Sequence, residues 1–123
     1  MNDVGFAGVG ELLVTFKASE LTKDADEGKP VKVSESGTVA LCSDGEDMIG
    51  VVKWIASDGT TCSVQLKGAA AVPYNDDGEL STPTVNYSAL VADGAGKLKV
   101  DVSGISYRIL AIDTTAKTII IML

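Results

Sequence analysis

The chain has 123 residues, a formal net charge of −7 and a hydrophobic content of 46%, with only 5% aromatic residues. This length suits one domain whose core needs no metal or disulfide, and a core of Val, Ile, Leu and Ala favours strands. The ten basic residues are scattered, which argues against direct binding of nucleic acid. No stretch approaches the ~18 apolar residues of a membrane span.

The first ten residues, MNDVGFAGVG, are rich in glycine and carry isolated apolar side chains at Val4, Phe6 and Val9. Two interpretations stay open: a disordered terminus, or an arm that orders on a partner with Phe6 as its anchor. The segment lacks the basic and apolar regions of a signal peptide. We therefore expect a soluble protein from a reducing compartment, with a flexible arm at 1–10 and one β-rich domain at 11–123.

Short strands separated by turn residues are expected along the rest of the chain. The run 11–18 alternates, with Leu12, Val14 and Phe16 on one face, and a hairpin is expected from 30 to 41. The strongest hairpin signal is Asp58-Gly59, because glycine supplies the positive φ that a tight turn requires. It joins the apolar run 48–56 to the alternating run 61–67, in which Cys62, Val64 and Leu66 share a face. Later strands are expected at 69–74, 87–92, 97–102 and 105–113, after a bulge at Gly68.

The last strand, Lys117–Leu123, is apolar on both faces, with Ile120 and Met122 on one of them. Such a pattern suits a central strand or one covered by a neighbouring subunit. Turn signals recur at the spacing expected of a small barrel or sandwich. The sequence therefore predicts an all-β fold: a small single-domain β-barrel or β-tulip-like structure with a glycine-rich arm and little helix.

Trp54 is the single tryptophan of the chain. Strict alternation places it on the same side of its strand as Val52 and Ala56, with Lys53 and Ile55 on the other. A buried tryptophan and an exposed interface hot spot are both compatible with this position.

No group in the sequence suggests catalysis. The chain has no histidine, which excludes the commonest general base and the Ser-His and Cys-His arrangements. Cys42 and Cys62 form no zinc motif and are interpreted as buried free thiols, although one bridge between them stays open. The acidic clusters at 24–27, 44–47 and 76–79 lack the ligand spacing of a calcium loop. We therefore expect a non-enzymatic protein with no catalytic, cofactor-binding or metal-binding residues.

The order of several short motifs resembles the capsid cement or head decoration proteins of bacteriophages, including the lambda type. The resemblance covers well over half of the chain and is best over 28–73. Its motifs are Gly28-Lys-Pro-Val-Lys-Val33, the strand 38–41, Ile49-Gly-Val-Val52, Val64-Gln-Leu-Lys-Gly68 and Val72-Pro73. A short arm and an unusually apolar last strand depart from the lambda type.

This resemblance implies a virion protein on the outer capsid surface, made in the host cytoplasm, that binds the major capsid protein as a homotrimer. It also implies strand pairing between the N-terminal arm and the shell. From the charge pattern and the lack of a long apolar run, we expect no direct nucleic-acid partner and no membrane partner. The interface candidates are Val4, Phe6, Val9, Leu12, Val14, Trp54, Ile120 and Met122. The alternative is a small β-barrel adaptor that binds one soluble protein partner.

Overall fold

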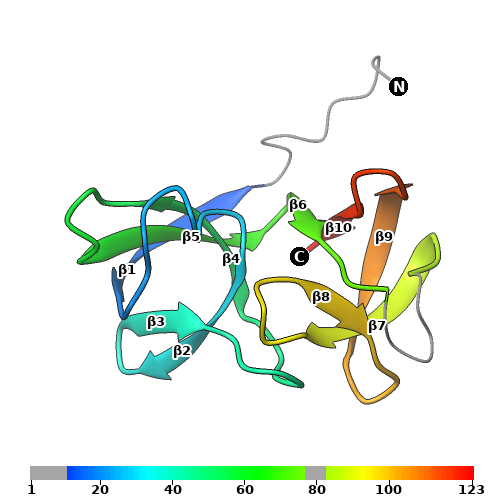
Figure 1. The fold of residues 1–123 in the computed structure, drawn as a ribbon, viewed down its shortest axis with the longest axis horizontal. Coiled ribbons are helices and arrows are strands. Elements are labelled where there is room, and N and C mark those ends of the chain that lie inside the picture. The colour runs from blue at the N-terminus through cyan, green and yellow to red at the C-terminus, as the bar shows by residue number, and fades with distance from the viewer. Residues whose placement is uncertain (1–10, 77–82) are drawn as a thin grey trace.

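A computed structural model describes residues 11–76 and 83–123, and within them the protein is all-β. Two five-stranded sheets lie side by side, β1–β5 in one and β6–β10 in the other (Figure 1). The strands are β1 (Leu12–Ala18), β2 (Pro30–Glu35), β3 (Thr38–Leu41), β4 (Gly50–Ile55), β5 (Thr61–Lys67), β6 (Ala69–Pro73), β7 (Asn86–Ala92), β8 (Leu98–Val100), β9 (Ile105–Asp113) and β10 (Thr118–Met122). The predicted all-β barrel is confirmed.

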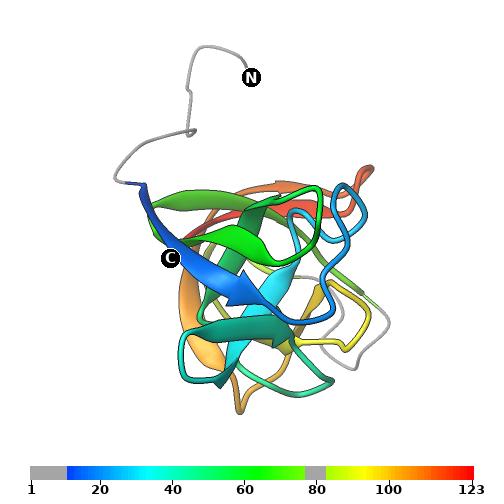
Figure 2. The same cartoon turned by 90° about the vertical axis from the view of Figure 1, so that its left-hand side faces the viewer.

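The first sheet closes into a barrel in the order β1-β3-β2-β4-β5, seen in front in Figure 2. The predicted hairpins β2–β3 and β4–β5 are antiparallel pairs, and Gly37 and Gly59 have the positive φ (both 74°) that their turns need. Alternate residues of each strand point into the barrel, and most of these side chains are aliphatic. Its buried residues are Leu21, Val31, Val39, Val52, Ile55, Cys62 and Val64.

The loop before β2 completes the barrel where β2 and β4 diverge. β2 pairs with β4 only at Pro30 and Val31. Toward the end of β4, no described strand pairs with it on this side, and two side chains of the loop form hydrogen bonds to its backbone instead. Glu27 Oε2 accepts a hydrogen bond from the Ile55 amide (2.8 Å), and Lys23 Nζ donates one to the Ile55 carbonyl (3.0 Å). Part of an acidic loop is therefore a structural element of the barrel wall.

The second sheet has the order β6-β10-β9-β7-β8 and curls toward closure. Tyr74, just after β6, forms a parallel bridge with Leu98 of β8. The core of this sheet also contains Cys42, Met48 and Val51, which come from the first half of the chain. The outer wall of the barrel therefore contributes to the core of the second sheet, so the two sheets form one domain.

The two sheets are joined at Gly68, the position predicted as a bulge. Its φ is +93°, and it separates β5 from β6. Gln65, on the face of β5 opposite Cys62 and Val64, is fully buried here. Its Nε2 donates to the carbonyls of Lys67 (3.0 Å) and Ala69 (2.8 Å), so it holds both sides of the connection.

Two sequence expectations need correction. Trp54 does not share a face with Val52, because a register shift between them makes Lys53 an extra residue opposite β5. The strand expected at 97–102 ends at Val100, and Val102 is 82% exposed in the following turn. On the predicted face of β1, Leu12 is exposed and Val14 and Phe16 are half-buried.

Candidate interaction surface

The first half of β1 has an open edge. β1 pairs with β5 along its length but with β3 only at Lys17 and Ala18. The Ala18 amide donates to the Thr60 carbonyl and the Lys17 amide to the Gly37 carbonyl. Even-numbered residues of β1 therefore direct their backbone groups toward β5, and odd-numbered residues direct theirs away from it.

The open edge consequently carries the backbone groups of Leu13 and Thr15. No strand of the described residues lies beside them. Leu12 and Leu13 are 45% and 47% exposed, and Val14, which is opposite the fully buried Val64, is itself only half-buried. An edge with free hydrogen-bonding groups and apolar side chains is able to accept another strand.

Trp54 is exposed on the outer wall of the barrel. The register shift turns both Lys53 and Trp54 outward, opposite Ser63. The indole is 49% exposed, and the Lys23 ammonium lies 5.3 Å from its ring centroid. Because Lys23 is also bonded to the backbone of Ile55, the surface around Trp54 is held in place before any partner binds. Burial of Trp54 in the core is therefore wrong, and the interface interpretation stays a prediction.

The outer face of the second sheet is a further apolar surface. Ile119 and Ile121 are fully buried, whereas Ile120 and Met122 point outward and are half-buried. β10 lies between β6 and β9, so the predicted central strand is confirmed. On neighbouring strands the same face carries Ala71, Tyr87, Arg108, Leu110 and Ala111. Tyr87 and Leu110 were not predicted, because their exposure depends on strand order and on the bulge in β9.

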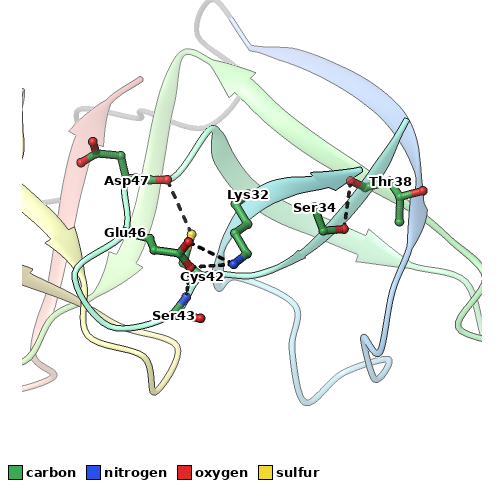
Figure 3. Close-up of polar contacts among 7 residues, drawn as sticks. All are labelled: Lys32, Ser34, Thr38, Cys42, Ser43, Glu46 and Asp47. Atoms are coloured by element: carbon green, nitrogen blue, oxygen red, sulfur yellow. Dashed lines mark hydrogen bonds and ion pairs between the residues drawn. The ribbon is translucent and has the colours of Figure 1, made fainter. Parts of the chain in front are cut away.

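The loop between β3 and β4 connects the barrel to the second sheet. Glu46 accepts hydrogen bonds from Lys32 Nζ (2.7 Å) and the Ser43 amide (2.6 Å) (Figure 3). These bonds hold the pKa of Glu46 below its usual value. The Glu46 carbonyl in turn accepts from the Ala92 amide of β7 (2.9 Å). The loop is therefore an ordered connection rather than a free acidic surface.

The two cysteines are free and buried in different cores, so the expectation of buried free thiols is confirmed. Burial, and then the nearby charge of Glu46, raises the pKa of Cys42 to about 11. Its Sγ lies 3.9 Å from the Asp47 carbonyl oxygen (Figure 3). A thiol in this environment is a poor nucleophile.

Within residues 11–76 and 83–123, no group of three or more Cys, Asp or Glu side chains is placed to hold a metal ion. The same residues include no helix long and apolar enough to cross a membrane. Carboxylates from the acidic clusters pair with lysines instead: Asp44 with Lys99 and Asp76 with Lys117.

The predicted interface residues do not gather at one place. Leu12 and Val14 lie on β1, Trp54 on the outer barrel wall, and Ile120 and Met122 on the second sheet. Leu12 and Met122 both lie beside the connection between the sheets, where Leu12 pairs with Lys67 and Met122 with Ala69. Val4, Phe6 and Val9 lie outside the described residues.

Comparison of the chain with protein-family models and with curated proteins gives no match. The residues and geometry above are therefore the basis for the function proposed below.

Proposed function

We propose that this protein is a non-enzymatic decoration, or cement, protein that binds the outer surface of an assembled phage head as a homotrimer. The observation that carries the proposal is the open edge of β1, which directly follows the glycine-rich segment 1–10. Strand pairing at this place supplies backbone hydrogen bonds, and the exposed Leu12 and Leu13 supply apolar contact.

Cement proteins need affinity for the shell and no chemistry. A ligand that binds only the assembled shell stabilises it by mass action. Three exposed or half-buried apolar surfaces are available for shell and subunit contacts: the β1 edge, Trp54 and the outer face of β10. The net charge of −7 favours solubility before assembly.

Co-sedimentation with expanded heads and with unexpanded proheads tests the proposal. We expect saturable binding to expanded heads at a fixed ratio to the major capsid protein. Absence of binding to either shell by the folded protein would overturn the proposal and favour the adaptor.

Replacement of Trp54 tests its part in shell binding. We expect Trp54→Ala to weaken binding by at least about tenfold, as for an interface hot spot, with little loss of stability because the indole is half exposed. Val102→Ala is the matched control, since Val102 is exposed and lies away from the three surfaces. If both variants bound the shell equally well, Trp54 would not be part of the interface.

A further inference from the structure

The outer wall of the barrel brings together outward side chains from β1, β5 and β4. Ser63 of β5 is opposite both Thr15 of β1 and Trp54 of β4, and residues opposite one another in a sheet point to the same face. Lys17 lies on this face two residues after Thr15, and Lys53, the extra residue of β4, is also exposed. We refer to these residues as the basic wall.

The charge of the basic wall is not balanced within the described chain. β1, β4 and β5 contain no Asp or Glu. Among residues 11–76 and 83–123, neither Lys17 nor Lys53 is in an ion pair, whereas other lysines are: Lys23, Lys29, Lys32, Lys99 and Lys117. A protein with a net charge of −7 therefore presents one barrel wall that is locally positive.

Trp54 supplies an apolar centre for this wall. Its side chain is half exposed, with the Lys23 ammonium over its ring. Lys23 is itself bonded to the Ile55 carbonyl, and its Nζ lies 3.6 Å from Glu27 Oε2, so its charge is paired within the chain. The charges that remain for a partner are those of the two wall lysines, beside an indole that is held in place.

We propose that the basic wall binds an acidic segment of the major capsid protein, with carboxylates at Lys17 and Lys53 and an apolar side chain on Trp54. This inference rests on the proposed function and assigns the chemistry of one shell contact. A short acidic segment fits the wall better than nucleic acid does, because the rest of a chain with net charge −7 repels a long polyanion. Such charge complementarity also orients the protein as it approaches the shell.

Charge reversal at Lys53 tests the charge of the partner. We expect Lys53→Glu to weaken binding to expanded heads by at least about tenfold in about 50 mM salt, but by less than about twofold in about 500 mM salt, because salt screens exposed charges. The matched control is Lys97→Glu, which makes the same charge change at an exposed lysine in the turn between β7 and β8. It should leave binding unchanged at both salt concentrations.

Salt dependence also separates the charged part of the wall from its apolar part. Trp54→Ala should weaken binding at both salt concentrations, because the burial of apolar area does not depend on screening. Lys53→Gln, which removes the charge without reversing it, should fall between the unmodified protein and Lys53→Glu in low salt. Circular dichroism should show the same fold for every variant, since the substituted side chains are exposed.

The outcomes distinguish this inference from the proposed function. If the unmodified protein bound heads and Lys53→Glu bound as well as Lys97→Glu, the acidic segment would be wrong while the decoration function stood. Absence of binding by the unmodified protein would overturn both. Sedimentation velocity of the free protein gives a further test. Self-association that disappeared in high salt and in Lys53→Glu would assign the wall to a second copy and overturn the shell contact.

Discussion

Individual carboxylates in the acidic loops act as structural hydrogen-bond acceptors. Asp26 is buried and accepts bonds from the Thr22 amide (2.8 Å) and from Lys29 Nζ (2.9 Å). Burial by itself raises the pKa of this carboxyl group, but the Lys29 and Thr22 bonds outweigh it, and the net pKa lies below the usual value. The ionised form therefore stabilises the loop that supplies Glu27 to the barrel wall.

Asp26→Asn should lower the free energy of unfolding at pH 7 by about 1.5–3 kcal/mol, the usual contribution of hydrogen bonds to a charged group. Because the pKa of Asp26 is lowered on folding, its contribution is complete above the unfolded-state value near 3.8 and disappears as the pH falls through the folded-state value. Denaturant unfolding of both proteins from pH 7 to pH 2 checks this. A difference that stayed constant down to pH 2 would contradict the assigned role of the charge.

At the scale of the element, β10 has two apolar faces with different functions. Ile119 and Ile121 are fully buried between β6 and β9. Ile120 faces outward, opposite Ala71 and Ala111, and is half-buried. The period of two in a strand separates these roles by one residue.

Ile121→Ala should therefore lower the free energy of unfolding by about 2–5 kcal/mol, the range for large-to-small changes in a core. The matched change Ile120→Ala should cost about 1 kcal/mol or less, as most surface changes do. Thermal or denaturant unfolding distinguishes them. Equal losses would show that the outer face of β10 is buried in solution, as it would be in an oligomer.

At the scale of the whole molecule, the barrel and the second sheet depend on each other. Val51 and Met48 belong to the core of the second sheet, and Gln65 holds the connection at Gly68. Gly50 lies against the backbone of Gln65, at a place where a Cβ atom would overlap the Gln65 carbonyl oxygen. These contacts predict that neither sheet is stable without the other.

We expect one cooperative unfolding transition, and the aromatic residues allow a direct test. The single tryptophan, Trp54, lies in the barrel, whereas Tyr74, Tyr87 and Tyr107 lie in or beside the second sheet. Trp54 fluorescence and the near-ultraviolet dichroism of the tyrosines should give the same denaturant midpoint. Two separated midpoints would show that the sheets unfold independently.

Local sequence patterns were sufficient for most strands and for both hairpins of the barrel. Asp58-Gly59 and Ser36-Gly37 mark turns because the positive φ of glycine is a local requirement. The exposure of Trp54 could not be predicted in this way, because one extra residue at Lys53 reverses the alternation that follows it. The burial of Gln65 and the exposure of Tyr87 depend on which strands become neighbours.

By itself, the sequence determined an all-β domain, its turns, the buried thiols and the two-sided apolar character of the last strand. These features follow from backbone preferences and from side-chain alternation within a few residues. Tertiary structure alone decided that the strands divide into a barrel and a second sheet with a shared core. It also decided that, among the described residues, the first half of β1 has no strand paired on the side toward β3. The physical reason is that strand neighbours are set by long-range pairing and burial, which no local stretch of residues contains.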